Sequence, residues 1–135
     1  MSDHTIRLLV VDDDARIRAA IARTIMLEAD LVLVAAARDA PGALSMAAAW
    51  HPEVVLLDVM LPDRATGLGL IRGLVRSPGC AVVAMSVRGA LRGAALAAGA
   101  VAFIEKSDVD ALLTQVRSAA ATGGLRHCAG VSPAV

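Results

Sequence analysis

The stretch Val54-Val55-Leu56-Leu57-Asp58 decides how this chain is expected to fold. Four branched apolar residues in succession leave no polar face, which is typical of a strand buried on both sides within a parallel sheet. The run ends at a carboxylate. Similar apolar runs recur along the chain, and they occupy residues 6–11, 31–35, 81–85 and 101–104. The sequence therefore predicts five buried strands.

Longer segments rich in Ala and Arg separate these runs and carry helical signals. Apolar residues recur at helical spacing in the first and the last segment: Ile17, Ile21 and Ile25 in one, and Val109, Leu112, Leu113 and Val116 in the other. Ser107 and Asp110 are expected to form a capping box for the last helix. Pro41 suits the first turn of a second helix, and residues 67–75 and 89–98 are predicted as the third and fourth, the fourth ending at Gly99. Alternating strands and helices indicate an α/β fold with helices on both faces of the sheet.

Length and composition limit the class of protein. A chain of 135 residues with 57% hydrophobic content suits one domain with its own core. Thirteen acidic residues balance thirteen basic ones, so no net field favours direct binding to nucleic acid or to a membrane. Cys80 and Cys128 lack metal-ligand spacing and fit a reduced cytosol. With no signal peptide and no apolar run of roughly 18 residues, the protein is expected in the cytoplasm.

Lys106 is the only lysine, and the other twelve basic residues are all arginine. It stands just after the last apolar run. An ammonium group is a compact charge on a slender stem, whereas a guanidinium is a wide planar fork that crowds a small anion site. We therefore expect Lys106 to meet a small anion, the alternative being a solvated strand end.

Polar residues follow most of the predicted strands. In open parallel α/β sheets ligands bind at the carboxyl ends of the strands, and the residues there are Asp12, Asp13, Asp14, Asp58, Ser86 and Lys106. Clustered carboxylates repel one another unless a divalent cation neutralises them, and oxygen ligands without histidine favour Mg²⁺ over zinc. A carboxylate beside a metal, a hydroxyl and an ammonium is also suited to receiving a phosphoryl group. Asp14 is separately explained as the cap of the following helix.

Three motifs together resemble the receiver domains of two-component response regulators, from about residue 6 to residue 121. They are Leu8-Leu9-Val10-Val11-Asp12-Asp13, Val54-Val55-Leu56-Leu57-Asp58-Val59-Met60-Leu61-Pro62 and Gly99-Ala100-Val101-Ala102-Phe103-Ile104-Glu105-Lys106, with Ser86 at a further strand end. The resemblance implies a flavodoxin-like (βα)5 fold, a doubly wound parallel sheet with strand order 2-1-3-4-5. Its members act in phosphorelay signalling.

The resemblance also implies a role for each site residue. Asp58 would be the phosphoacceptor, with Mg²⁺ bound directly by Asp13 and Asp58. Asp12 would orient metal-bound water, and the backbone carbonyl of Met60 would complete the protein ligands.

Two further residues would form the switch. Ser86 would be the hydroxyl that moves toward the phosphoryl group, which Lys106 also contacts. Phe103 stands at the position of the switch aromatic, although it could equally serve as a core side chain.

Partners follow from the same resemblance. A sensor histidine kinase, a phosphotransfer protein or a small phosphodonor would supply the phosphoryl group. Phosphorylation would alter the face made by the fourth helix, fifth strand and fifth helix, which would bind a downstream effector protein or pair two copies of the chain. Beyond accepting phosphoryl groups and slow auto-dephosphorylation, the chain is not expected to be an enzyme.

The receiver is predicted to span residues 1–122, and residues 123–135 are predicted as a flexible tail or linker stub. A helix-turn-helix does not fit into this tail. The chain is therefore expected to be a stand-alone receiver or a regulator separated from its effector. Ser107 follows Lys106, at a position where many receivers have proline. In having no proline there, the chain resembles the LuxR/NarL-type subgroup of transcription regulators.

Some positions depart from the usual receiver pattern. The loop from Asp58 to Gly67 is slightly longer, and the interval from Ser86 to Lys106 slightly shorter, so the fourth helix is expected to start late. Val87 follows the switch hydroxyl where a smaller residue is common. Its bulk, with that of Met60, is expected to slow the attack of water on the acyl phosphate.

Two alternatives remain at this point. A haloacid-dehalogenase-like phosphatase also uses a strand-end Asp, Mg²⁺, Ser or Thr and Lys, and Asp12-Asp13-Asp14 contains a D-x-D. Against it, Arg16 stands where that motif has Thr or Val, no second acidic pair follows Lys106, and no segment could form a cap domain. The other alternative is a degenerate pseudo-receiver, an interaction module that works without phosphorylation.

Overall fold

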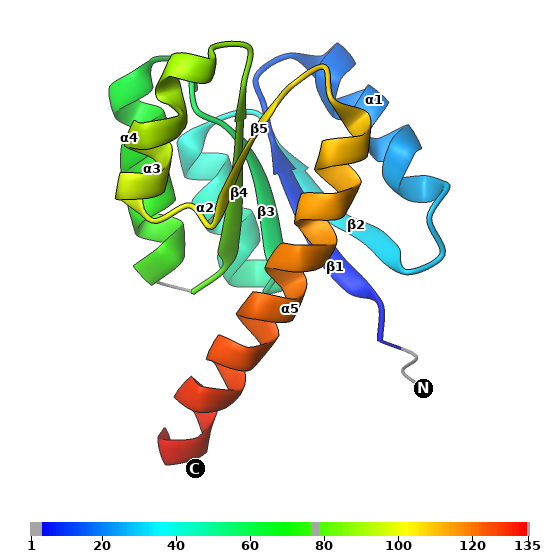
Figure 1. The fold of residues 1–135 in the computed structure, drawn as a ribbon, viewed down its shortest axis with the longest axis vertical. Coiled ribbons are helices and arrows are strands. Elements are labelled where there is room, and N and C mark those ends of the chain that lie inside the picture. Colours follow the sequence, from blue (N-terminus) through cyan, green and yellow to red (C-terminus); the bar gives the residue numbers. More distant parts are fainter. Residues whose placement is uncertain (1–3, 77–78, 135) are drawn as a thin grey trace.

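Branched apolar residues dominate the central strands, and these strands form a parallel sheet enclosed by helices (Figure 1). The computed structural model describes residues 4–76 and 79–134. Within them the strands are β1 (Ile6–Val11), β2 (Leu31–Ala37), β3 (Val54–Asp58), β4 (Ala81–Ser86) and β5 (Ala102–Glu105). Their order is β2-β1-β3-β4-β5. The predicted flavodoxin-like topology is thereby confirmed.

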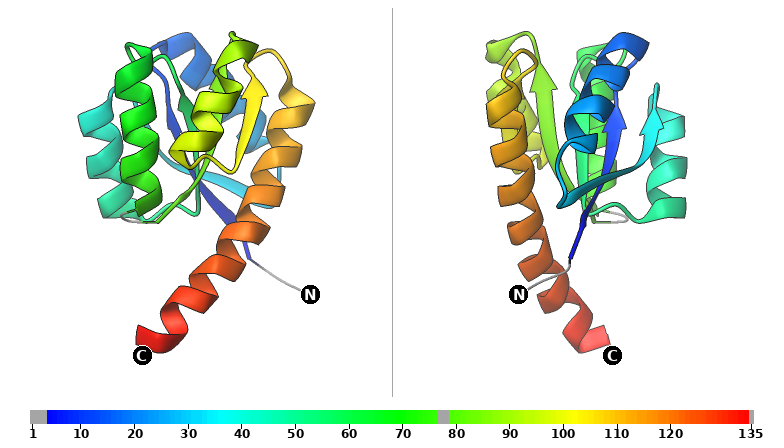
Figure 2. Two further views of the ribbon diagram at one scale, coloured as in Figure 1. Left: turned by 60° about the vertical axis from the view of Figure 1, so that its left-hand side comes forward. Right: turned by 90° about the vertical axis from the view of Figure 1, so that its right-hand side faces the viewer.

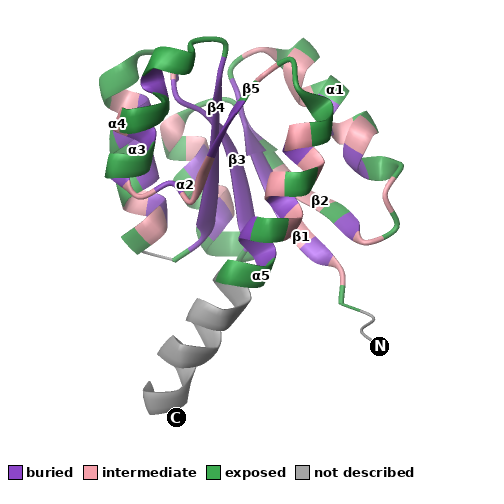
Figure 3. Cartoon of the chain, in the orientation of Figure 1, coloured by how far each residue is buried: buried purple, intermediate pink, exposed green. Residues whose placement is uncertain are grey.

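Helices cover both faces of the sheet (Figure 2). Those on one face are α1 (Ala15–Met26) and α5 (Val109–Ala134), and those on the other are α2 (Ala40–Trp50), α3 (Arg64–Arg76) and α4 (Arg92–Ala98). Alternate side chains of β1 serve the two layers, because Leu8 and Val10 belong to one core cluster and Leu9 and Val11 to the other. The central strands β3 and β4 are buried along their whole length (Figure 3). None of the helices described is long and apolar enough to cross a membrane.

The fourth helix begins late, as expected from the short interval after Ser86, and it starts at Arg92 rather than at the predicted residue 89. A 3₁₀ turn over Gly89–Leu91 precedes α4, which starts only at Arg92. Gly99 ends the helix with φ of 118°, a left-handed conformation that glycine adopts without strain. The segment between Ser86 and α4 is thus a short turn rather than a regular helix.

The cap of the last helix differs from the sequence prediction. The expected capping box of Ser107 and Asp110 is wrong, because Asp108 caps α5 by accepting a hydrogen bond from the Ala111 amide at 3.0 Å. The Asp108 amide donates to the Glu105 carbonyl at 3.0 Å. This tight turn after β5 places Asp108, and not Ser107, directly before the helix.

The helix α5 is longer than the sequence predicts. Its helical pattern was expected to end near residue 121, at Thr122-Gly123-Gly124, whereas the structure continues the helix to Ala134, past the edge of the sheet (Figure 1). Side chains from residue 123 onward lie outside the described part. The division into a receiver of residues 1–122 and a tail stays a prediction.

Arg117 joins α5 to the connection between α1 and β2. Its guanidinium donates to Glu28 Oε1 at 2.7 Å, to Asp30 Oδ2 at 2.8 Å and to Asp30 Oδ1 at 2.9 Å. The bidentate contact fixes the guanidinium plane. Hydrogen bonds from Arg117 also hold the pKa of the Asp30 carboxyl below its usual value. The contact fastens α5 to the edge of the molecule opposite the site.

Replacing Arg117 by Gln should lower the melting temperature at neutral pH, and the loss should shrink in acid. An Asp with a lowered folded-state pKa contributes stability above its ordinary value, 3.8, and that stability is lost as the pH falls through the lowered pKa. Thermal unfolding followed by the fluorescence of Trp50, the single tryptophan, measures both effects. Arg72→Gln removes an exposed arginine of α3 as the control. Equal losses in the two variants at every pH would contradict the prediction.

Candidate functional site

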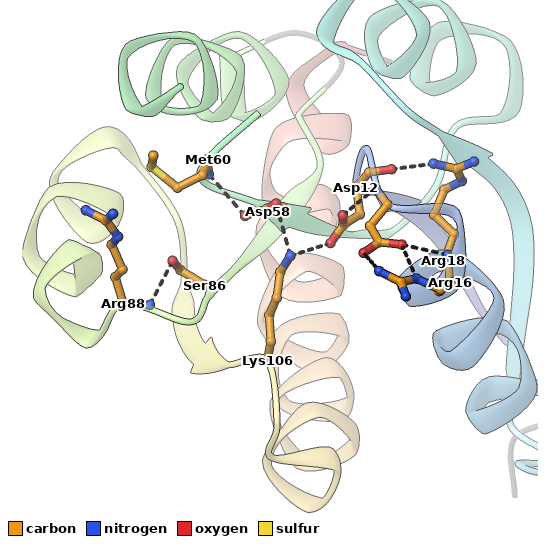
Figure 4. Close-up of polar contacts among 9 residues, drawn as sticks. Asp12, Arg16, Arg18, Asp58, Met60, Ser86, Arg88 and Lys106 are labelled. Carbon is orange, nitrogen blue, oxygen red and sulfur yellow. Dashed lines mark hydrogen bonds and ion pairs between the residues drawn. The ribbon is translucent and has the colours of Figure 1, made fainter. Parts of the chain in front are cut away.

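Four strand ends bring polar side chains together at one edge of the sheet (Figure 4). Asp12 directly follows β1, Asp58 ends β3, Ser86 ends β4 and Lys106 directly follows β5. Asp12 is 0% exposed, Asp58 5% and Ser86 1%, and they are the only polar residues in the buried class among those described. Burying polar groups is costly unless they are paired or bind a ligand. Their grouping therefore marks this edge as the candidate site.

Three carboxylates form the acidic part of the site. One oxygen from each of Asp12, Asp13 and Asp58 lies within 4.8 Å of the others. Lys106 Nζ lies 2.7 Å from Asp12 Oδ2 and 3.0 Å from Asp58 Oδ2, so one ammonium serves the two buried carboxylates. Asp13 is exposed and makes no ion pair among the described residues. Three carboxylates contacted by one ammonium leave excess negative charge, which a divalent cation would neutralise.

The charges of Asp58 and Lys106 depend on one another. Burial raises the pKa of the Asp58 carboxyl above its usual value, although Lys106 and the Met60 amide act in the opposite direction. Burial alone would lower the pKa of Lys106, but its contacts with Asp12 and Asp58 outweigh that effect and raise it. Lys106 is therefore cationic at neutral pH. Ionised Asp58 gains from any further cation that enters the site.

The loop after Asp58 is held by backbone contacts. The Met60 amide donates to Asp58 Oδ1 at 3.1 Å, and the Val59 amide donates to the Met85 carbonyl at 3.0 Å. In α3, Gly67 approaches this loop so closely that an added Cβ would lie 1.6 Å from the Val59 carbonyl oxygen. Sequence reasoning used Gly67 only as a helix boundary. Its role in seating the loop depends on how α3 packs, which no local pattern reveals.

The loop after β1 is held from α1. The Asp14 amide donates to Asp12 Oδ1 at 2.9 Å, and Arg18 Nη1 donates to the Asp12 carbonyl oxygen at 2.7 Å. Asp14 caps α1 by accepting from the Arg16 amide at 2.8 Å, as predicted. The apolar spacing of Ile17, Ile21 and Ile25 gave no indication that Arg18 contacts the site. The available signal was its position one turn after the capping residue.

Ser86 lies near Asp58 (Figure 4), but among the described residues its hydroxyl forms no hydrogen bond with the acidic group. Its Oγ accepts a hydrogen bond from the Arg88 amide at 3.0 Å, and among the described residues it bonds to neither Asp58 nor Lys106. The Ser86 carbonyl accepts from the Lys106 amide at 3.2 Å, which ties the ends of β4 and β5 together. The hydroxyl therefore still has a proton to donate.

Two apolar residues near Ser86, Phe103 and Val87, differ in how far they are exposed to solvent. Phe103 is 8% exposed and belongs to the same core cluster as Leu91 and Ala95, on the α4 side of the sheet. Val87, directly after Ser86, is 75% exposed. Phe103 is thus a core aromatic here, whereas Val87 places apolar bulk at the surface beside the site.

The sequence model of the response regulator receiver domain matches residues 8–117. A protein-glutamate methylesterase/protein-glutamine glutaminase 2 of Shewanella sp. (strain MR-7) is 39% identical over 111 residues, which cover 78% of this chain and 31% of the relative. The chain spans less than a third of the length of the methylesterase relatives it matches.

Solved structures agree with this match. The response regulator domain of CheB from Thermotoga maritima has a TM-score of 0.79 and 27% identity, and the alignment covers 87% of this chain and 97% of that one. The signal receiver domain of NarL from Mycobacterium tuberculosis has a TM-score of 0.71 and 28% identity, covering 84% and 98%.

Two glycine substitutions in α3 should have opposite effects on stability. Gly67→Ala should cost about 1–3 kcal/mol of unfolding free energy or more, because its Cβ collides with the Val59 carbonyl. Gly69→Ala meets nothing within 4 Å and should gain about 0.5–1 kcal/mol from helix propensity. Denaturant unfolding followed by Trp50 fluorescence measures both. A Gly67→Ala variant as stable as Gly69→Ala would show that the loop after Asp58 yields freely.

Proposed function

This chain belongs to the response regulator receiver domain family, which acts in two-component signal transduction, and on that basis we propose that it receives a phosphoryl group on Asp58 with the help of Mg²⁺. The observation that carries the proposal is the pair of buried carboxylates, Asp12 and Asp58, bridged by Lys106 beside an exposed third carboxylate. The family match also favours a receiver over the phosphatase alternative.

The residues at this edge fit a magnesium ion. Asp13, Asp58 and the Met60 carbonyl would hold it directly, and Asp12 would hold it through a metal-bound water. All of these donors are oxygen atoms, the kind that Mg²⁺ prefers, and the uncompensated negative charge favours a divalent cation. When bound, the ion would help to neutralise the charge on the phosphoryl oxygens.

Asp58 is the nucleophile in this proposal. One carboxylate oxygen forms a bond to phosphorus, while the bond from phosphorus to the donor's imidazole nitrogen breaks and the leaving group keeps that electron pair. With acetyl phosphate the broken bond is the one to the acetate oxygen. The Met60 amide holds Oδ1 and Lys106 holds Oδ2, so the plane of the carboxylate is fixed before a donor arrives.

The phosphoryl group would then be recognised by two donors. Lys106 is already within reach of Asp58, whereas the Ser86 hydroxyl would have to turn from the Arg88 amide toward the new oxygens. That movement would pull on the short turn before α4. Phe103, in the core cluster beneath α4, would follow it as the switch aromatic. The altered surface would be the face of α4, β5 and α5. Phosphorylation would favour one of two pre-existing conformations of this face.

Partners are proposed from the chemistry of the site and from the family. The donor would be a sensor histidine kinase or a phosphotransfer protein in the cytoplasm. The downstream partner that binds the phosphorylated receiver would be an effector protein, an effector domain in a longer protein or a second copy of this chain. For the receiver itself we propose acceptance and slow loss of the phosphoryl group as its only reactions.

Incubation with acetyl phosphate and Mg²⁺ should add the mass of one phosphoryl group to the native chain, because Asp58 is placed for attack. Intact-protein mass spectrometry measures the gain, which EDTA should abolish. Asp58→Asn should gain nothing. Asp63→Asn, which alters an exposed carboxylate in the same loop, should be phosphorylated like the native chain. No gain in the native chain would identify a pseudo-receiver, and a gain in Asp58→Asn would place the acceptor elsewhere.

Replacing Val87 by Ala should shorten the lifetime of the phosphorylated protein several-fold. The exposed valine beside Ser86 is expected to hinder the approach of water to the acyl phosphate, together with Met60. The loss of phosphoryl mass with time after donor removal measures the lifetime. Val109→Ala, at another exposed valine at the start of α5, should leave it unchanged. Equal lifetimes for Val87→Ala and the native chain would count against the shielding role.

A further inference from the structure

Arg18 reaches from α1 to the backbone of the acidic loop (Figure 4). Its Nη1 donates to the Asp12 carbonyl oxygen at 2.7 Å, and the residue is half-buried, whereas Arg16 on the same helix has a side chain that is 91% exposed. A hydrogen bond from a charged donor to a backbone carbonyl is stronger than one between neutral groups. This contact is therefore a specific attachment of α1 to the site.

The contact matters because of the peptide it holds. Asp12 is fixed at three other points: its amide donates to the Ala37 carbonyl at 3.1 Å, its Oδ1 accepts from the Asp14 amide and its Oδ2 pairs with Lys106. The Asp12 carbonyl, in contrast, belongs to the peptide unit that leads into Asp13.

Asp13 has no comparable support. It is exposed, and among the described residues its carboxylate makes no hydrogen bond or ion pair. Its direction therefore depends on the two peptide units that flank it. The peptide after Asp13 is held through the Asp14 amide, and the peptide before it is held by the Arg18 side chain. Because Asp13 is one of the three grouped carboxylates, a rotation of this peptide would move one of the proposed metal ligands.

We propose that Arg18 is a positioning residue for the metal site: by holding the peptide between Asp12 and Asp13, it presents the Asp13 carboxylate to the cation. This inference rests on the proposed function, in which the three carboxylates bind Mg²⁺. Arg18 touches neither the ion nor the phosphoryl group in this role.

The charge of Arg18 and its hydrogen bond to the Asp12 carbonyl should affect Mg²⁺ affinity in opposite directions, so the proposed role can be tested. A guanidinium close to a cation site repels the cation, so removing its charge would tighten Mg²⁺ binding if charge were its main effect. Removing the group that orients Asp13 would instead weaken binding. A hollow of about 370 Å³ beside Arg18, which Arg38 and Met46 also line, leaves room for a replaced side chain.

The test is the affinity for Mg²⁺ alone, measured by isothermal titration calorimetry on the whole chain. Arg18→Gln should bind Mg²⁺ roughly ten-fold more weakly, the order expected for losing one charged hydrogen bond. Arg18→Lys keeps the charge without the planar fork and should also bind more weakly than the native chain. Arg16→Gln removes the same charge from the same helix and should bind as well as the native chain or slightly better.

A second readout separates positioning from catalysis and from folding. At saturating Mg²⁺, Arg18→Gln should be phosphorylated by acetyl phosphate at nearly the native rate, and the amide resonance of Asp13 should be shifted in the metal-free variant. Trp50 fluorescence reports whether each variant is folded. If Arg18→Gln does not fold, the Mg²⁺ affinity of Arg18→Lys tests the proposal instead.

Two outcomes would overturn the inference in different ways. If the native chain binds Mg²⁺ and the folded Arg18 variants bind it equally well or more tightly, Arg18 has no positioning role and the proposed function stands. If the native chain binds no Mg²⁺ at all, the proposed function fails together with the inference.

Discussion

The bridge from Lys106 to Asp12 and Asp58 is the contact on which the site depends. It joins the ends of β1, β3 and β5 through atoms 2.7 Å and 3.0 Å apart, in a place where both carboxylates are almost fully buried. A buried carboxylate without a partner carries a large desolvation cost, so removing the ammonium would leave two uncompensated charges inside the protein. The only lysine of the chain therefore serves the stability of the fold and the proposed chemistry together.

The single ammonium of this bridge does not neutralise all the carboxylates of the site, and the remaining negative charge favours cation binding. One ammonium does not balance three grouped carboxylates, and burial already raises the pKa of Asp58. A further cation would stabilise a site in this state, and it would also favour the ionised form of Asp58 that the proposed reaction requires. The excess negative charge thus links the arrangement of the strand ends to the proposed phosphoryl transfer.

Helices on both sides of the sheet support this small group of charges. From α1, Arg18 holds the carbonyl before Asp13, and from α3, Gly67 allows the loop after Asp58 to sit against the helix. On the β4 side, Ser86 makes its contact with the Arg88 amide and not with Asp58. The side of the site proposed to bind the metal is therefore held by contacts from two helices, while the Ser86 hydroxyl on the other side makes no hydrogen bond to Asp58.

Much of this fold could be predicted from the residues alone. The apolar runs indicated where the strands lie, because short runs of continuous apolar character, separated by helical segments, are typical of strands buried on both faces. The strand ends then placed Asp12, Asp58 and Lys106 at one edge of the sheet. The strand order and the role of each residue came from resemblance to a family, since periodicity says nothing about which strands are neighbours.

The tertiary structure decided the contacts between elements. Asp108 rather than Ser107 caps α5, because the turn after β5 sets where that helix starts. The close approach of Gly67 to Val59 and the reach of Arg18 to Asp12 depend on how α3 and α1 lie on the sheet. A sequence pattern reports the environment of a residue within its own helix or strand, whereas these contacts depend on the distances and angles at which separate elements pack.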